Sequence, residues 1–336
     1  MPYRFAIIGC GNIAARHAEH IQSCGKLVAV CDVIESRVQV LGNQYHANIY
    51  KDHKMLLENE QPDIVVICTP NGLHAGHAED ALLLGAHVLC EKPMVIHATD
   101  GRKLVKTAAD SGKKLFVVKQ NRFNPPVAAI KQLIEEGKLG KITGFHINCA
   151  WNRPPAYYEN SWRGTRDLDG GILYTQFSHF IDILHWYMGN ISQVSGWRAN
   201  LSHQHSIEFE DTGAASIVME SGAIGSISYT INAYRSNMEG SFTLFGEKGT
   251  VKIGGQYLNT IEYFSVENET PPVIQYGPSN NYGFYKGSMS NHGNVYEELV
   301  KALDDPSYKF LEAEEALKSV EMIEQIYSAS PFVKSV

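Results

Sequence analysis

The sequence lacks the features of a membrane-spanning or a nucleic-acid-binding protein. No apolar run approaches the roughly 20 residues that are needed to cross a bilayer. Basic residues number 29 against 36 acidic ones, and the formal net charge of −7 is opposite to the basic surface that binds a phosphate backbone. The N-terminus runs directly into an apolar strand, so we also expect no secretory leader. These absences predict a cytoplasmic protein with neither a membrane nor a nucleic-acid partner.

Cysteine is scarce and forms no recognisable pattern. The six cysteines lie at positions 10, 24, 31, 68, 90 and 149, all in the first half of the chain, and no two of them form a C-x-x-C pair. This spacing argues against a zinc or disulfide framework and is typical of reduced thiols in a protein core. Two histidine pairs, His74 with His77 and His203 with His205, have no third ligand nearby in the sequence, so we expect no metal site.

At 336 residues the chain is longer than one ordinary hydrophobic core, and its pattern changes at about residue 122. Before that point strands and helices alternate, and wholly apolar strands such as Ile64–Cys68 indicate a parallel sheet covered on both faces. After it, long β-type runs are separated by glycine-containing turns. We therefore predict an α/β domain over 1–121, with a doubly wound, Rossmann-type parallel sheet, and an α+β domain over 122–336 with a large, open and mostly antiparallel sheet.

The pattern also predicts the individual elements. In the first domain we expect strands at 3–9, 27–32, 47–50, 63–68, 87–90 and 115–118, and helices at 12–24, 34–44, 51–59, 73–85 and 97–111. In the second domain we expect a helix at 124–136, β-type runs at 141–151, 193–203, 211–219, 223–232, 240–246 and 249–253, and an interrupting helix at 170–188. Residues 267–290 are expected to form a loop, and helices at 291–304 and 311–328 close the chain and can return to the first domain.

The first strand ends in the motif G-x-G-x-x-A, formed by Gly9, Gly11 and Ala14. Gly9 permits a tight turn, Gly11 lets the backbone approach a pyrophosphate, and Ala14 allows the helix to pack closely on the strand. The helix that follows begins near Asn12 and Ile13, and its N-terminus offers unpaired N–H groups and a partial positive charge to phosphates. A tight turn without a ligand would show the same glycines, so the motif needs its context.

That context is a second apolar strand, Leu27–Cys31, which ends at Asp32, about 20 residues after the glycines. An acidic residue at this place hydrogen-bonds the adenosine ribose. A carboxylate there also repels a 2′-phosphate, and no basic residue follows before Arg37. The sequence therefore predicts a dinucleotide site with NAD, rather than NADP, as the cofactor.

Lys92 lies in the sequence Glu91-Lys92-Pro93, directly after the apolar strand His87–Cys90. A lysine at the carboxyl end of a parallel strand is well placed to contact a substrate hydroxyl beside the nicotinamide. Partial burial and a nearby cation would both lower its pKa from about 10.4. An ordinary surface lysine is an equally good interpretation from spacing alone.

The predicted helix at 170–188 has two distinct faces when it is projected at about 100° per residue. One face is apolar, and the other gathers Thr175, Gln176, His179, Asp182 and Trp186. A solvated face normally carries lysine, arginine or glutamate, and this one has none, which favours a cleft over solvent. An unperturbed imidazole titrates near pH 6.5, so His179 is suited to accept the proton of a hydroxyl group.

Residues 151–166 interleave basic and aromatic side chains: Arg153, Arg163 and Arg166 with Trp151, Tyr157, Tyr158 and Trp162. Guanidinium groups next to flat rings suit a substrate that carries a carboxylate or a phosphate. A surface network of ion pairs with aromatic packing would produce the same composition, and the sequence does not separate the two interpretations.

Several stretches together resemble the Gfo/Idh/MocA oxidoreductases, namely Ala6–Ala14, Thr69–His74, Cys90–Pro93 and Asp169-Gly-Gly171 followed by His179–Asp182. That family pairs a Rossmann domain with an α+β domain whose open sheet often mediates oligomers, so the resemblance implies a homo-oligomer, either a dimer or a tetramer. Further stretches, including Leu115–Arg122, Trp162–Thr165, Glu210–Gly213 and Leu244–Val251, are similar to one subgroup, the UDP-N-acetylglucosaminuronic acid 3-dehydrogenases of O-antigen precursor synthesis.

The resemblance implies that NAD⁺ oxidises the C3 hydroxyl of a nucleotide sugar, with Lys92 and His179 as the catalytic residues. Many family members carry an aspartate four residues before the histidine, where this chain has Thr175. We therefore expect no carboxylate one turn away to assist His179. In some members of the subgroup, NADH is retained and reoxidised by 2-oxoglutarate. Two alternatives stay open: another sugar or polyol dehydrogenase, such as one acting on inositol, and a non-catalytic NAD-binding regulatory protein.

Most of the predicted site residues follow the carboxyl ends of strands, where a doubly wound sheet binds its ligands. Cofactor contacts are expected from Gly9, Gly11, Asn12, Ile13, Asp32, Thr69, Asn71, His74, Glu91, Lys92, Gln120, Trp162 and Arg163. Contacts to a small-molecule sugar substrate are expected from Lys92, Lys119, Asn121, Arg153, Tyr157, Arg163, Thr175, Gln176 and His179.

Overall fold

The computed structural model describes residues 2–274, 279–281, 286–289, 291–305, 307–310 and 312–333. The chain forms two compact units, each built from two separate stretches of sequence. Unit 1 comprises Met1–Lys119 and His292–Val320, and unit 2 comprises Gln120–Asn291 and Glu321–Val336. In the described ranges, no helix combines the length and the hydropathy that crossing a membrane requires.

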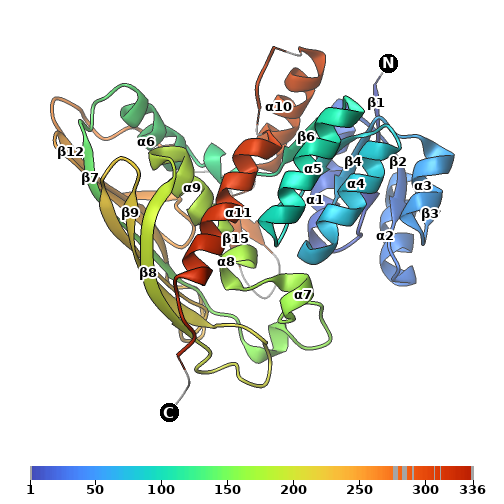
Figure 1. Ribbon diagram of the computed structural model, residues 1–336. Helices are drawn as coiled ribbons and strands as arrows, with labels where there is room; N and C mark the ends of the chain where they lie inside the picture. Colours follow the sequence, from blue (N-terminus) through green and yellow to red (C-terminus); the bar gives the residue numbers. More distant parts are fainter. Residues whose placement is uncertain are drawn as a thin grey trace. The chain divides into compact units, whose positions relative to one another are not determined.

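Unit 1 contains a six-stranded parallel sheet with the strand order β3-β2-β1-β4-β5-β6 (Figure 1). The strands are β1 (Tyr3–Ile8), β2 (Gly25–Cys31), β3 (Asn48–Tyr50), β4 (Ile64–Ile67), β5 (His87–Cys90) and β6 (Leu115–Val117). All four residues of β4 are fully buried, as expected for a strand whose two faces are both covered by helices. The predicted Rossmann-type sheet is confirmed, because this order reverses at β1 as a doubly wound sheet does.

The helices of unit 1 follow the strands in turn. They are α1 (Asn12–Cys24), α2 (Glu35–Tyr45), α3 (His53–Glu60), η1 (Asn71–Leu73), α4 (His74–Leu83) and α5 (Ala98–Ser111). From the end of the chain comes α10 (His292–Asp304), where the Tyr296 ring stacks on that of His20 in α1. The last helix, α11 (Ala313–Ser328), begins in unit 1 and ends in unit 2.

Unit 2 contains a seven-stranded sheet with the order β13-β12-β11-β7-β10-β9-β8, in which only the β10–β7 pair is parallel. The strands are β7 (Ile142–Ala150), β8 (Ile191–Ala199), β9 (Thr212–Met219), β10 (Ile224–Thr230), β11 (Glu239–Gly246), β12 (Gly249–Gly254) and β13 (Thr260–Val266). Its helical elements are η2 (Gln120–Phe123), α6 (Pro125–Glu135), η3 (Pro155–Tyr157), α7 (Arg166–Asp169), α8 (Ile172–Thr175) and α9 (Ser178–Met188). The predicted large, mostly antiparallel sheet is confirmed.

The two faces of this sheet differ. Phe145 and Ile147 of β7 are fully buried on the inner face, where Tyr187 of α9 packs on Phe242 of β11. On the outer face His146 is exposed and Trp197 of β8 is 64% exposed. The sheet is thus open on one side. The expected oligomer concerns contacts with a second copy of the chain and stays a prediction.

Several predicted elements are wrong in detail. The single helix expected at 170–188 is divided into α8 and α9, because the Phe177 N–H bonds to Ile172 O (3.0 Å) and the Phe177 ring packs on Trp151. The strand expected at 193–203 ends at Ala199, since the turn after it is bonded to Asp211. The strand β13 and the short helix α7 had no counterpart in the prediction.

The loop expected at 267–290 is only partly described. Two short strands within it, β14 (Ser279–Asn281) and β15 (Lys286–Met289), pair with each other in an antiparallel manner, so this part of the prediction is wrong. Residues 275–278, 282–285 and 290 lie outside the described residues.

Candidate functional site

The turn after β1 requires glycine at one position and leaves space at another. Gly9 has φ +95°, and a Cβ there would lie 2.6 Å from the carbonyl carbon of Cys68, so no other residue fits. A Cβ on Gly11 would meet no atom within 4 Å. The packing of the protein therefore explains Gly9, whereas the space above Gly11 matches the predicted approach of a pyrophosphate.

The N-terminus of α1 presents its first N–H groups beside this space. The helix begins at Asn12 and Ile13 after the N-cap Gly11, which has no side chain to cap it, and its first turn contains no acidic residue. Asp32, at the end of β2, accepts hydrogen bonds from the backbone N–H groups of Cys10 (2.7 Å) and Ile34 (2.8 Å). The carboxylate is thus held at the strand end and partly exposed, as the predicted ribose contact requires.

The turns that follow β4 and β5 are joined by His74. One ring nitrogen of this fully buried side chain lies 2.8 Å from Thr69 O, and the other lies 2.7 Å from Pro93 O. The hydroxyl of Thr69 lies 3.1 Å from Nδ1 of His77, and Asn71 begins η1 as a buried residue. We interpret His74 as a structural link between the turns after β4 and β5, because both of its ring nitrogens already face protein carbonyls.

The carboxylate of Glu91 belongs to a buried cluster that sequence reasoning missed. Its Oε1 lies 2.9 Å from His17 Nε2 of α1 and 3.6 Å from His292 Nε2 of α10. The other ring nitrogen of His17 lies 2.9 Å from the hydroxyl of Tyr296. The ligand atoms of His17, Glu91 and His292 lie within 4.8 Å of one another. No local pattern relates α1 to α10, which explains why the sequence did not reveal the cluster.

Charge and hydrogen bonding connect the members of this cluster. Burial lowers the pKa of His17, which favours a neutral ring that donates to Glu91. Burial alone would raise the pKa of Glu91, but His17 and the more distant His292 outweigh it and hold that pKa well below its usual range. The Glu91 Oε2 also accepts the N–H of Lys92 (3.1 Å). The Glu91 side chain thus fixes the turn that carries Lys92, whose own side chain is half-buried.

In unit 2, His179 is buried near the start of α9, which excludes the alternative of a solvated helix face. Its Nε2 lies 3.5 Å from the side-chain nitrogen of Gln120. Asp182, one turn further along, is not available to a ligand, because it forms a bidentate ion pair with Arg122 at 2.7 and 2.8 Å.

Buried side-chain amides gather on the segments next to His179. Gln120 and Asn121 of η2 and Gln176 before α9 are each at most 5% exposed. Among the described residues, Oε1 of Gln120, Oδ1 of Asn121 and both polar atoms of the Gln176 side chain have no hydrogen-bond partner. Buried polar groups are normally satisfied, so these atoms are suited to a polar ligand such as a sugar. Lys119, in unit 1, donates to the Ser319 hydroxyl (3.1 Å) instead.

Two guanidinium groups lie over one aromatic ring. The Cζ atoms of Arg153 and Arg163 are 5.3 and 4.8 Å from the centre of the Tyr157 ring, and Arg163 also lies 5.0 Å from that of Trp162. Within the described part of the chain, Arg163 forms no ion pair and its buried Nε has no hydrogen-bond partner. Arg153 also donates to Asn152 O (2.6 Å) and to Asn237 Oδ1 (3.1 Å). Two cations over one ring favour a bound anion, which supports the predicted carboxylate or phosphate contact.

Thr175 has a carboxylate beside it, and the expectation that none assists His179 stays a prediction. Its hydroxyl donates to Asp169, the last residue of α7. Asp169 is fully buried and also accepts the backbone N–H of Gly164 (2.8 Å). The motif Asp169-Gly-Gly171 contained this residue, but nothing in its spacing indicated that the chain turns back there.

His203 and Asp211 hold the loop that supports Arg153. His203 Nε2 lies 2.7 Å from Arg153 O, and its Nδ1 lies 3.3 Å from Asp211 Oδ2. Burial would raise the pKa of Asp211, but hydrogen bonds from His203 and from the N–H groups of Ser202 and Leu201 lower it to about 2. Burial would lower the pKa of His203, but its contacts with Asp211 and with the carbonyl of Arg153 outweigh burial and raise it, so both partners are charged in mildly acidic solution.

Asp211→Asn should therefore lower stability in a pH-dependent way. The folded pKa lies below the unfolded value, so the stabilisation is present above about pH 4 and is lost as the pH falls towards 2. We expect urea unfolding to show a loss of about 2 kcal/mol at pH 6 and about half of that loss at pH 3. The exposed Asp167→Asn is the control. An equal loss at both pH values would contradict the assignment.

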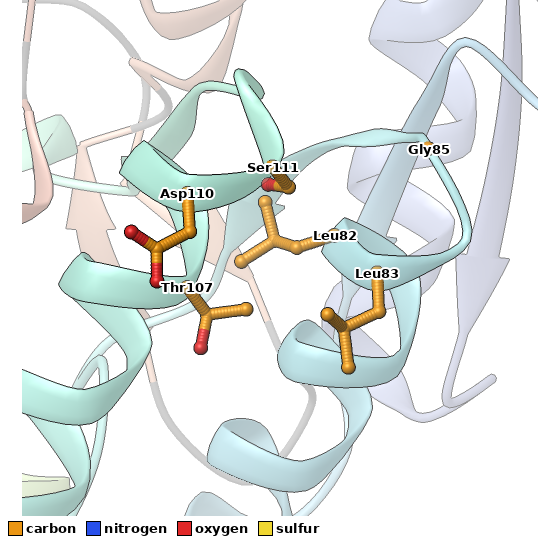
Figure 2. A pocket seen from close by; sticks show the side chains of 6 residues that line it. All are labelled: Leu82, Leu83, Gly85, Thr107, Asp110 and Ser111. Carbon is orange, nitrogen blue, oxygen red and sulfur yellow. The ribbon is translucent and has the colours of Figure 1, made fainter.

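A surface cavity of about 320 Å³ lies elsewhere, at the ends of α4 and α5 (Figure 2). It is lined by Leu82, Leu83, Gly85, Thr107, Asp110 and Ser111. None of the predicted site residues lines it, so we do not regard it as the candidate site.

Comparison with known proteins finds one family model that matches the first part of the chain and a second that matches the part after it. The model described as "Oxidoreductase family, NAD-binding Rossmann fold" matches residues 3–119, and the one described as "GFO/IDH/MocA C-terminal domain" matches residues 127–252. The WlbA dehydrogenase from Bordetella pertussis, solved in complex with NADH and UDP-GlcNAcA, is 33% identical, with a TM-score of 0.88 over 98% of this chain and 97% of that one. The WlbA enzyme from Chromobacterium violaceum, solved with the same two molecules, is 31% identical, with a TM-score of 0.88 over 98% and 94%.

Curated relatives match smaller parts of the chain. D-Glucoside 3-dehydrogenase of Escherichia coli K12 is 36% identical over 145 residues, which are 42% of this chain and 41% of that protein. The chain thus matches less than half the length of that relative. Inositol 2-dehydrogenase of Salmonella typhimurium is 25% identical over 241 residues, or 66% of this chain and 67% of that protein.

Proposed function

Because the chain belongs to the Gfo/Idh/MocA oxidoreductase family, we propose that it oxidises the C3 hydroxyl of UDP-N-acetylglucosaminuronic acid to the 3-keto sugar. The chain is an NAD-dependent dehydrogenase of a family whose members act on sugars and polyols. What the proposal adds is the identity of the sugar, the carbon that is oxidised and the residues that act.

The observation that carries the proposal is the pair of guanidinium groups over Tyr157. A uronic acid supplies a carboxylate and a nucleotide supplies two phosphates, so this substrate has the anions that Arg153 and Arg163 favour. The buried amides of Gln120, Asn121 and Gln176 have the donors and acceptors that sugar hydroxyl and acetamido groups need. The two WlbA structures, which hold UDP-GlcNAcA, support the same substrate.

In the proposed reaction each residue has one task. Bound NAD⁺ supplies the acceptor for the hydride that leaves C3. His179 accepts the hydroxyl proton, and Lys92 donates a hydrogen bond to the same oxygen. Arg163, with Arg153, holds the anionic part of the substrate. In unit 1, the space above Gly11, the N-terminus of α1 and the carboxylate of Asp32 fit the pyrophosphate and the ribose of NAD.

A second candidate is an inositol or free-sugar dehydrogenase. The relationship to inositol 2-dehydrogenase favours it, since that match extends over two thirds of both proteins. An uncharged polyol, however, carries no anionic group for the guanidinium of Arg163, which lies over the Tyr157 ring. The presence of both Lys92 and His179 argues against a non-catalytic NAD-binding protein, which needs neither.

Thermal unfolding in saturating NAD⁺ tests the proposal. The ligands to compare are UDP-N-acetylglucosaminuronic acid, UDP-N-acetylglucosamine, UDP-glucuronic acid and myo-inositol. A ligand at 100 times its Kd adds roughly 2.7 kcal/mol, which is a rise in Tm of about 5–10 °C. We expect that rise for the acetamido-uronate only. It should be absent in Arg163→Ala and retained in Arg166→Ala, whose exposed guanidinium is bonded to Glu208. An equal or larger shift with myo-inositol would overturn the proposal.

A further inference from the structure

Asp169 has the surroundings of a functional carboxylate. The residue ends the four-residue helix α7, and the left-handed Gly170 and Gly171 (φ +87° and +132°) follow it. Its side chain is fully buried, although an isolated carboxylate is costly to remove from water. A buried carboxylate is therefore expected only where its contacts stabilise the negative charge or where that charge serves the function of neighbouring residues.

The contacts of Asp169 lead to the two places where the substrate is expected. One carboxylate oxygen accepts the N–H of Gly164 (2.8 Å), the residue after Arg163. The other accepts the hydroxyl of Thr175, the last residue of α8, four positions before His179. Asp169 is thus bonded both to the loop of Arg163 and to the turn that leads into α9.

Neighbouring groups respond to this negative charge. Burial raises the pKa of the Tyr158 hydroxyl, and the charges of Tyr157 and Asp169 raise it further. Tyr158 stands edge to face with Tyr157, the ring over which Arg163 lies. The buried Asp169 carboxylate therefore acts on the aromatic and basic loop through protein, where its charge is screened less than it would be in water.

We propose that Asp169 is the positioning carboxylate of the substrate site: through Gly164 it sets the place of Arg163, and through Thr175 it sets the place and the charge environment of His179. The inference rests on the proposed function in that Arg163 and His179 are taken to act on the substrate. When His179 accepts a proton it becomes a cation, and a fixed negative charge nearby favours that form.

Asp169→Asn removes the charge and keeps the shape. The amide oxygen still accepts from Gly164, and the amide nitrogen donates to the hydroxyl of Thr175. We expect the folded protein to bind NAD⁺ as the wild type does. We expect kcat to fall about 10- to 100-fold, because small misplacements of catalytic groups cost rate on this scale. Asp167→Asn, an exposed acid-to-amide change on the same helix, is the matched control and should leave kcat unchanged.

Moving the carboxylate provides the rescue. Thr175→Asp alone puts two carboxylates in contact, so Tm and kcat should both fall, because like charges at this separation cannot both ionise without cost. Asp169→Asn with Thr175→Asp restores one carboxylate beside one amide. We expect the double variant to exceed both single variants in kcat and to exceed Thr175→Asp in Tm. The Tm cycle shows that the two side chains interact, and the recovery of kcat above that of Asp169→Asn is the result that a merely structural role would not produce.

The outcomes separate this proposal from the proposed function. The kinetic measurements use whichever sugar or polyol of the panel reduces NAD⁺. If that compound is not UDP-N-acetylglucosaminuronic acid, the proposed function is refuted, but the role of Asp169 can still be tested with it. The Tm cycle needs no substrate at all. An Asp169→Asn enzyme with wild-type kcat, or a double variant whose losses are the product of the two single losses, would overturn the positioning role.

Discussion

Replacing His179 with alanine should lower kcat by about 10²–10⁴-fold, which is the usual contribution of a general base. The affinity for NAD⁺ should change little, because His179 belongs to unit 2 and the glycine turn, the N-terminus of α1 and Asp32 belong to unit 1. The measurement is single-turnover NADH formation, which stays informative even if NADH is retained between turnovers.

The control for this prediction is His146→Ala. His146 is exposed on the outer face of the sheet, where it contacts Ser226 of β10 (2.9 Å), so its loss should leave kcat unchanged. A His179→Ala enzyme with kcat within about threefold of the wild type would show that another group takes the proton, and the assignment of the base would fail.

Replacing Asp182 with alanine should cost about 3–5 kcal/mol of stability, because it leaves the Arg122 guanidinium buried without its partner. The two side chains are only 4% and 7% exposed, and Arg122 also lies 5.0 Å from the centre of the Trp186 ring. For a unit of this size the loss corresponds to a fall in Tm of about 10 °C, which thermal unfolding would measure.

A double variant separates the lost charge pair from lost packing. Arg122→Met with Asp182→Leu replaces the ion pair by apolar groups, and such replacements are often neutral or stabilising. We expect it to recover more than half of the stability that Asp182→Ala loses. If Asp182→Ala melts within 2 °C of the wild type, a shift worth less than about 1 kcal/mol, the pair is not an essential part of the core.

Local sequence patterns predicted the parts of the site that depend on neighbours in the chain. Gly9 and Gly11 were predictable because a turn between a strand and a helix has a fixed backbone shape, and Asp32 because a parallel strand ends there. The burial of β4 was likewise evident in four consecutive branched residues. The helix at 170–188 was predicted as one piece, because its periodicity continues across a break that Phe177 and Trp151 impose through packing.

The parts that the sequence did not reveal depend on distant contacts. Tyr296 meets His17 across 279 positions, and Tyr327 donates to Glu210 across 117. A Cβ on Gly171 would lie 2.4 Å from the Tyr327 hydroxyl, so even the need for this glycine is set by the last helix. The function of Asp169 was hidden for a different reason: its partners are near in sequence, but the direction of its side chain depends on the turn at Gly170 and Gly171.

The central claim is that the hydrogen at C3 of UDP-N-acetylglucosaminuronic acid leaves as a hydride. We would incubate the wild-type enzyme and NAD⁺ with substrate that carries deuterium at C3 only, and with substrate that carries it at C4 only, and weigh the reduced cofactor by mass spectrometry. The account predicts singly deuterated NADH from the C3-labelled sugar and unlabelled NADH from the C4-labelled one. Label in NADH from C4, or reduction of NAD⁺ by myo-inositol and not by this nucleotide sugar, would contradict it.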